Sequence, residues 1–199
     1  MSALSARHVW TYRLIFVLLS LAIISLRLLP LEQSSLPTAQ PNVLGDEGTA
    51  LRTFISNLFA SLPGPDILVL LTFAWVVRQP TLVPFGLMAA VFLLADFLFL
   101  RPPGLWTLLM VLASESVRRK RLTMTELPFL VEWGGVALAI MSMVLLNRLF
   151  LWMLLVDLDS LGLTLAHAIV TILTYPFVVG ISKFVFGLRK LGPTELEAL

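Results

Sequence analysis

Cysteine is absent from this 199-residue chain, and charged residues make up only 13% of it. Without thiols the chain can form no disulfide framework, no thiolate metal site and no cysteine nucleophile. The scarcity of charge is matched by 58% hydrophobic residues and a mean hydropathy of +0.95. A soluble domain of this length has too small a core to hide so much apolar surface. The composition therefore predicts an integral membrane protein.

Motifs of enzymatic chemistry are missing as well. The sequence contains no glycine-rich phosphate loop, no pair of carboxylates at catalytic spacing, and no serine, histidine and aspartate set expected at one membrane depth. His167 stands alone in an apolar run, so we expect a hydrogen bond within a helix bundle, with metal binding as the alternative. We therefore expect a protein that is not an enzyme and holds no metal or cofactor.

Six apolar runs of 12 or more residues are hydrophobic all round, which predicts membrane helices instead of the alternating strands of a barrel. The second and fourth runs are too short to cross about 30 Å of hydrocarbon. Neighbouring helices must shield them, or the membrane must be thinner there. We thus expect an all-α, polytopic membrane protein with a single transmembrane domain over residues 1–199. Its six predicted spans are residues 13–31, 66–78, 81–100, 105–118, 129–147 and 161–188.

Two further segments have predicted structures that differ from a membrane-spanning helix. Residues 32–65 are rich in serine, proline, glutamine, asparagine and glycine, which predicts an exposed loop. Apolar residues at helical spacing from Leu51 to Leu62 predict an amphipathic helix in this loop that lies flat on the membrane. The apolar stretch 127–156 is too long for one straight crossing. We expect its last part, residues 148–156, to form a separate interfacial piece.

Positive charge orients the predicted spans. With a cytoplasmic N-terminus, ten of the 14 lysine and arginine residues fall on the cytoplasmic side. The positive-inside rule then predicts that both termini are cytoplasmic and that the loop 32–65 is periplasmic. The net charge of +2 resides in short loops, where it indicates orientation and contact with anionic lipid instead of nucleic-acid binding.

Polar residues inside the apolar runs are costly in a membrane and need an explanation. Asp66 follows Pro65 at a helix start, where its carboxylate can accept hydrogen bonds from the first-turn amides. A partner or ligand contact at the outer face is the alternative. Asp96 lies near the outer end of its span, where an ion pair with Arg101 or a hydrogen bond between helices is the simpler role. A proton relay is its alternative.

At the opposite interface the sequence predicts a basic loop. It consists of Arg118, Arg119, Lys120 and Arg121, and it serves as a topology determinant that also meets anionic lipid. Docking of a cytoplasmic protein is the alternative. Glu115 and Glu132 lie at the cytoplasmic ends of their spans, where we expect them to pair with this loop. The five tryptophans, Trp75 among them, fall near predicted interfaces and are expected to form an aromatic belt.

Four motifs of the central stretch also occur together in a known family. They are Pro65-Asp66 before a leucine-rich run, Trp75 with Arg78-Gln79-Pro80 at its end, Leu93-Leu94-Ala95-Asp96, and Arg101-Pro102-Pro103-Gly104-Leu105-Trp106. With these motifs, its size and its six-span pattern, the whole chain resembles the bacterial rod shape-determining protein MreD family. The resemblance implies a fold similar to the substrate-binding subunits of energy-coupling factor transporters.

The resemblance further implies a non-enzymatic scaffold in the bacterial inner membrane. Such a subunit of the cell-wall elongation complex binds MreC and acts with MreB, RodA and an elongation-specific penicillin-binding protein in side-wall peptidoglycan synthesis and rod cell shape. Small residues at 134, 135 and 137 would permit close approach of a partner helix. The residues expected to bind the partner or to hold the structure are Asp66, Trp75, Arg78, Asp96, Arg101 and Gly104.

A second class of function stays open from the residues alone. Short helices broken by proline and glycine around Asp96 are typical of transporter subunits that bind a substrate. The alternative is therefore a membrane subunit that binds a vitamin-like or lipid-linked small molecule. It predicts a ligand-sized cavity open to the outer face.

Overall fold

The computed structural model describes residues 6–29, 64–125, 128–156 and 160–186. These residues contain no strand, so the all-α prediction is confirmed for them. Their helices are α1 (Ala6–Leu28), α3 (Ile67–Arg78), α4 (Phe85–Leu98), α5 (Leu105–Thr125), α6 (Phe129–Met153) and α7 (Leu161–Phe186). Helices α1, α6 and α7 are long and apolar enough to cross a membrane, which indicates an integral membrane protein. The six-span topology and the cytoplasmic termini stay predictions.

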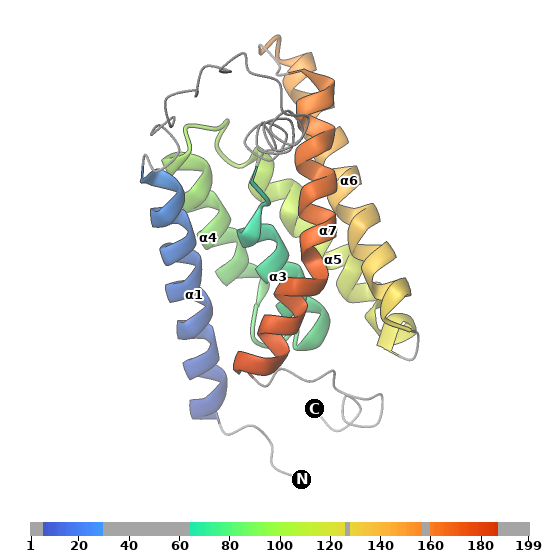
Figure 1. The fold of residues 1–199 in the computed structure, drawn as a ribbon. Helices are drawn as coiled ribbons and strands as arrows, with labels where there is room; N and C mark the ends of the chain where they lie inside the picture. Colours follow the sequence, from blue (N-terminus) through green and yellow to red (C-terminus); the bar gives the residue numbers. More distant parts are fainter. Residues whose placement is uncertain (1–5, 30–63, 126–127, 157–159, 187–199) are drawn as a thin grey trace, which may run out of the picture.

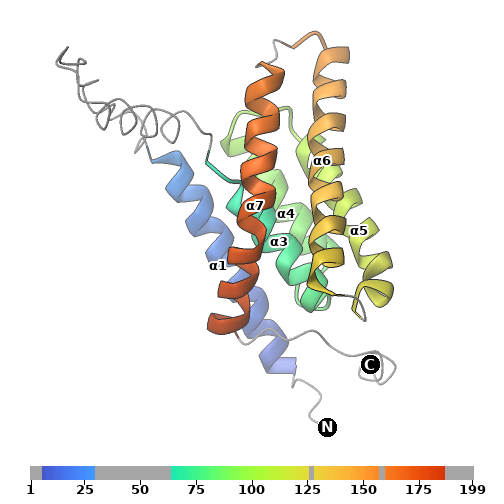
Figure 2. The same ribbon diagram turned by 45° about the vertical axis from the view of Figure 1, so that its right-hand side comes forward.

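The helices run alternately up and down in one bundle, with α1 at its edge (Figures 1 and 2). At one end α3, α5 and α7 begin, and we call it the Arg101 end. At the opposite end α4 and α6 begin, and we call it the Glu132 end. Helix α1 begins and α7 ends at the Glu132 end (Figure 1).

Helix α3 is the centre of the bundle. It has only 12 residues, and every one from Leu68 to Arg78 is buried. Helices α1, α5 and α7 contact it, and further contacts between α4 and α5, α5 and α6, and α6 and α7 complete the bundle. About 18 Å of helix cannot cross a bilayer alone. Its neighbours therefore shield it, as one of the two sequence-based explanations requires.

Two helices end in the same motif at the Arg101 end. After α4, Leu100 has a φ of 53°, and after α6, Leu155 has a φ of 54°. The N–H of Arg101 donates to the carbonyl of Asp96 at 3.1 Å, and the N–H of Leu100 donates to that of Phe97 at 3.3 Å. This pattern is a Schellman motif, which satisfies the last carbonyls of the helix. It turns the chain sharply, so that Arg101 lies beside the bundle.

Gly104 precedes α5 with a φ of 87°. Residues with a Cβ atom adopt this backbone conformation only with strain. We expect Gly104→Ala to lower the free energy of unfolding by about 1–2 kcal/mol, measured by titration with sodium dodecyl sulfate in mixed micelles. No atom lies within 4 Å of the added Cβ, so the loss reports backbone strain alone. Gly86→Ala within α4 is the matched control, because its φ is ordinary and its Cβ also meets nothing. Equal stability of the two variants would contradict this explanation.

Several predicted boundaries differ from the structure. Helix α5 continues to Thr125, so the residues 118–121 lie in a helix and not in a loop. Arginine and lysine favour helices, and Glu115 pairs with Arg119 one turn later. Helix α6 continues to Met153, whereas we expected a break near residue 147.

The remaining differences lie at the ends of other helices. Helix α1 begins earlier than the predicted span 13–31, and α4 is shorter than the predicted span 81–100. Pro84 immediately precedes α4 and disfavours helical conformation in the residue before it. Residues 32–63 of the predicted periplasmic loop, with its amphipathic helix, lie outside the described residues.

Candidate functional site

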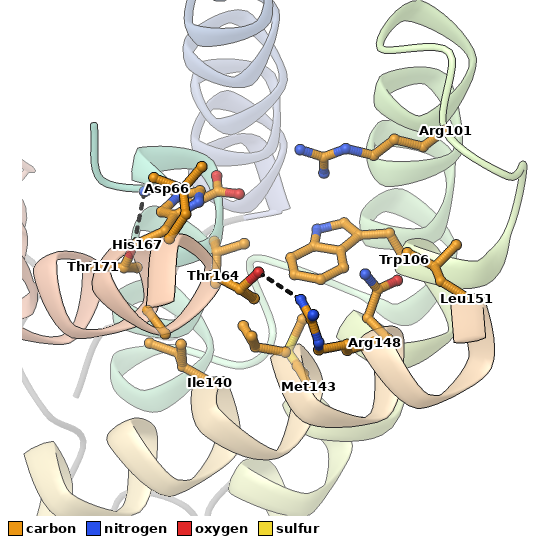
Figure 3. Close-up of a pocket in the computed structure, with 15 residues that line it drawn as sticks. Asp66, Arg101, Trp106, Ile140, Met143, Arg148, Leu151, Thr164, His167 and Thr171 are labelled. Carbon is orange, nitrogen blue, oxygen red and sulfur yellow. Dashed lines mark hydrogen bonds between the residues drawn. The ribbon is translucent and has the colours of Figure 1, made fainter. Parts of the chain in front are cut away.

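A cavity of about 320 Å³ lies at the Arg101 end, between α3, α6, α7 and the start of α5 (Figure 3). This volume is at the lower end of the roughly 300–1,000 Å³ found for small-molecule sites. The cavity wall is amphipathic, because it contains apolar side chains as well as charged and polar ones. The polar side chains come from four parts of the chain and include Asp66, Arg101, Asn147, Arg148, Thr164 and His167.

Arg101 lies over two aromatic rings. Its guanidinium carbon is 5.4 Å from the centroid of Phe99 and 5.4 Å from that of Trp106, which are favourable cation–π distances. In Figure 3 the guanidinium extends above Trp106 toward the side of Asp66 and His167. No carboxylate among the described residues forms an ion pair with Arg101. Within the described part of the chain, aromatic contacts and not an opposite charge therefore hold this cation in place.

Asp96 holds the turn on which Arg101 is placed. Its side chain is fully buried, and Oδ2 accepts hydrogen bonds from the N–H of Gly104 at 3.1 Å and from the N–H and hydroxyl of Thr107 at 3.2 and 2.8 Å. The carboxylate of α4 thus caps the N-terminus of α5, where the helix dipole favours negative charge. Of the two simpler roles, the ion pair with Arg101 is wrong and the hydrogen bond between helices is confirmed. The Arg101 turn and the start of α5 form one unit.

Asp66 does not cap α3 with its side chain, so that expectation is wrong. Its Oδ1 lies 3.7 Å from Nη2 of Arg27 on α1. The same Nη2 donates a hydrogen bond to the carbonyl of Pro65 at 2.7 Å. The Asp66 carboxylate interacts more strongly with the charged guanidinium than with the neutral amides of the first helical turn. The backbone N–H of Asp66 donates to Thr171 Oγ1 on α7 at 3.1 Å. Asp66 therefore joins three helices and lines the cavity.

Arg148 and His167 also line the cavity. They were not among the candidate site residues predicted from the sequence. Arg148 Nη1 donates to Thr164 Oγ1 at 3.0 Å (Figure 3). The Nε2 of His167 is enclosed and has no hydrogen-bond partner among the described residues, so the predicted bond within the bundle does not form at this nitrogen. The described residues also contain no cluster of three potential metal ligands.

Two signals in the sequence point to this part of the site. Arg148 interrupts an apolar run, and a cation inside a membrane segment is a functional candidate by default. Thr164, His167 and Thr171 recur at spacings of three and four, which places them on one helix face. Both signals mark polar faces turned toward each other across α6 and α7.

A second buried cluster lies at the Glu132 end and joins α3, α6 and α7. Glu132 is fully buried, and its Oε1 lies 3.9 Å from Nη2 of Arg78. The hydroxyl of Tyr175 donates to the same oxygen at 3.0 Å. Among the described side chains, Glu132 therefore pairs with the central helix and not with Arg118 or Arg119. Its position in the first turn of α6 faces the bundle interior, where the central helix supplies the cation.

Trp75 is a core residue and not a member of an interfacial belt, because its side chain is fully buried. Its ring centroid lies 5.5 Å from that of Phe16 and 6.4 Å from that of Tyr12. Both partners belong to α1. Trp75 therefore attaches the edge helix to the central one, and it lies in neither cavity.

The basic segment at the end of α5 serves mostly local contacts. Arg118 donates to the carbonyl of Val83 at 2.8 Å and so fixes the chain before α4. Arg119 pairs with Glu115 at 3.1 Å on the helix surface. Lys120 lines a second cavity. Arg121 lies in the helix, and its side chain is outside the described part of the structure. The prediction that Glu115 pairs with this segment is confirmed.

The second cavity, of about 250 Å³, lies between α5 and α6. We call it the α5–α6 groove, because Leu112 and Leu138 on its wall are 55% and 64% exposed. Small residues from both helices line the groove, namely Ala113, Ser116, Gly135, Ala139 and Ser142. Of the small residues noted in the sequence, Gly135 lines it, whereas Gly134 and Ala137 do not.

Comparison with known proteins returns no match: no family model, no curated protein and no solved structure corresponds to this chain.

Proposed function

We propose that this chain is a non-enzymatic membrane scaffold of the bacterial cell-wall elongation complex, similar to the MreD family. In this role it spans the inner membrane six times, with both termini in the cytoplasm. It binds MreC, and through the larger complex with MreB, RodA and an elongation-specific penicillin-binding protein it supports side-wall peptidoglycan synthesis and rod shape. The motifs around Asp66, Asp96 and Arg101 motivate this proposal.

The α5–α6 groove is the observation that best supports a scaffold. On α6, small residues recur as Gly135, Ala139 and Ser142, at the spacing that places them on one helix face. In lipid, apolar surface does not drive helices together, so association depends on close packing around small residues. Ala113 and Ser116 on α5 complete the opposite wall. The small residues of the groove suit close packing against an apolar helix, and we assign this surface to the transmembrane helix of MreC.

Retention of MreC by the purified protein tests this assignment. We expect wild-type protein to retain MreC through detergent purification, and Ala139→Phe to reduce the retained amount about tenfold, since the phenyl ring overfills the groove. Ala90→Phe is the matched control, because Ala90 is exposed on α4, away from the groove, and should leave retention unchanged. Quantitative immunoblotting of the eluted complex measures the ratio.

Two results would refute the assignment. Wild-type protein that never retains MreC would remove the scaffold proposal itself. Equal losses for Ala139→Phe and Ala90→Phe would show that the groove is not the contact. Both variants must elute at the wild-type volume in size-exclusion chromatography, so that a loss reports the interface and not the fold.

The cavity at the Arg101 end favours a second candidate function. A membrane subunit that binds a vitamin-like or lipid-linked small molecule needs a ligand-sized cavity at one end of its bundle. The 320 Å³ cavity with its convergent polar side chains has that form. Neither function excludes the other, because the cavity and the α5–α6 groove share Met143 but otherwise have different walls.

A further inference from the structure

We propose that the cavity at the Arg101 end binds an amphipathic anion, with its phosphate or carboxylate group at Arg101 and Arg148 and its apolar body against the cavity floor. This inference rests on the second candidate function and names the chemistry of its ligand. It does not depend on the binding of MreC.

The charges around the cavity favour an anion. Arg101 and Arg148 line it together with one carboxylate, Asp66. That carboxylate already faces Arg27 at 3.7 Å, so it is not available to balance a second cation. Arg148 has a hydroxyl, Thr164 Oγ1, as its hydrogen-bond acceptor. No described carboxylate pairs with either of the two lining arginines. The two guanidinium groups that line the cavity therefore favour an oxyanion as its ligand.

Neither Arg101 nor Arg148 uses all of its N–H donors. A guanidinium group carries five N–H donors in a planar fork that matches the oxygens of phosphate and carboxylate. The bond to Thr164 uses Nη1 of Arg148, and the rings of Phe99 and Trp106 contact Arg101 through their faces. Figure 3 shows Arg101 and Arg148 on opposite sides of Trp106, with both guanidinium groups directed to the cavity. The ring holds Arg101 in place without consuming its hydrogen bonds.

The floor of the cavity is apolar. Val69, Ile140, Met143 and Ala168 line it, and each is at most 3% exposed. A ligand that is anionic throughout would leave this surface without apolar contacts, and a wholly apolar ligand would leave the two guanidinium groups without an anionic partner. An amphipathic molecule satisfies both parts. The volume of about 320 Å³ admits a short apolar chain or a single ring system.

His167 adds a directional contact on the α7 side. Its enclosed Nε2 has no hydrogen-bond partner in the described part of the chain, although an enclosed polar atom normally finds one. His167 lines the cavity beside Thr164, one helical turn away on the same face. A rotation of the imidazole that opens Nε2 to the cavity would let a ligand oxygen or hydroxyl bind it, whichever of the two ring nitrogens carries the proton.

Hexyl phosphate is a suitable probe, with hexyltrimethylammonium as its cationic counterpart. With the full chain in a neutral maltoside detergent, isothermal titration calorimetry should show saturable binding of hexyl phosphate and none of the cation. Arg101→Gln and Arg148→Gln should each weaken binding about tenfold or more, because each removes a charge-assisted hydrogen bond. Arg119→Gln is the matched control, since Arg119 lies exposed on the opposite half of α5 and should not change the affinity.

Ala168→Phe keeps both arginines but fills the apolar floor, and it should also weaken binding about tenfold. This variant keeps the proposal testable if an arginine variant does not fold. Binding to wild-type protein in zwitterionic nanodiscs distinguishes two sources of the anion. Competition by added phosphatidylglycerol would identify a lipid headgroup, and unchanged affinity would identify a free small anion. Both results support the shared chemistry.

Three results would overturn the inference: no saturable binding of hexyl phosphate, binding that both arginine substitutions leave unchanged, or equal binding of the cation. Equal binding of the cation would leave the second candidate function standing, because a small molecule would still enter the cavity. Retention of MreC by Arg101→Gln, measured in parallel, reports the scaffold role separately. The two roles can therefore fail independently.

Discussion

Replacing Glu132 by alanine should lower the free energy of unfolding by about 3–5 kcal/mol. The substitution removes the carboxylate beside the guanidinium of Arg78, which is itself only 5% exposed, and it removes the acceptor of the Tyr175 hydroxyl. A buried cation that loses its counterion keeps its desolvation cost without the attraction that offsets it. Titration with sodium dodecyl sulfate in mixed micelles, followed by circular dichroism, measures the change.

Glu115→Ala is the matched control for this result. Glu115 also pairs with an arginine, at 3.1 Å, but its side chain is 45% exposed, so we expect a loss of at most about 0.5 kcal/mol. Tyr175→Phe should cost about 1 kcal/mol, because one buried hydrogen bond is lost. Joint replacement of Arg78 and Glu132 by methionine should recover much of the loss. A cost for Glu132→Ala that does not exceed that for Glu115→Ala would refute the structural role of the buried pair.

Replacing Asp96 by alanine should lower the free energy of unfolding by about 3 kcal/mol, since three buried or partly buried donors lose their acceptor. These are the N–H of Gly104 and the N–H and hydroxyl of Thr107. The first turn of α5 should open more often, and its amides should exchange hydrogen faster. Hydrogen exchange with mass spectrometry of the peptide spanning residues 99–110 measures this directly.

Thr107→Val provides the graded comparison, because it removes one of the three hydrogen bonds and should cost about 1 kcal/mol. The affinity for hexyl phosphate should fall in Asp96→Ala as well. Asp96 holds the turn that carries Arg101 and therefore acts on the ligand as a positioning residue. Wild-type exchange rates at the start of α5 in Asp96→Ala would contradict the capping role.

Residues that interact with near neighbours were the easiest to predict. The hydrogen bond between helices at Asp96 was predicted, although its partners Gly104 and Thr107 were not. All three residues lie within 12 positions of one another, on either side of a short turn between two apolar runs. Glu115 and the residues 118–121 are likewise close in sequence. They pair because residues three or four positions apart are neighbours on a helix surface. The helical state of these basic residues was missed, because a charged segment after an apolar run is equally compatible with a loop.

Contacts between distant parts of the chain escaped prediction. Glu132 meets Arg78 and Tyr175 across separations of 54 and 43 positions, and Arg27 meets Asp66 across 39. A hydropathy pattern places each of these residues at a depth in the membrane but does not say which helix lies beside it. Asp66 was thus assigned to its nearest amides and Glu132 to its nearest cations, whereas tertiary packing supplied stronger partners.

By itself the sequence determined that the chain is helical, that its apolar runs suit a membrane, and that the polar residues of the central stretch gather at helix ends. These properties follow from composition and local spacing, which depend on the chain alone. The tertiary structure decided that α3 is the central helix, that Trp75 is buried, and that Arg101, Arg148 and His167 surround one cavity. Side-chain partners depend on the order in which helices pack around α3, and that order comes from the fit of whole helix surfaces.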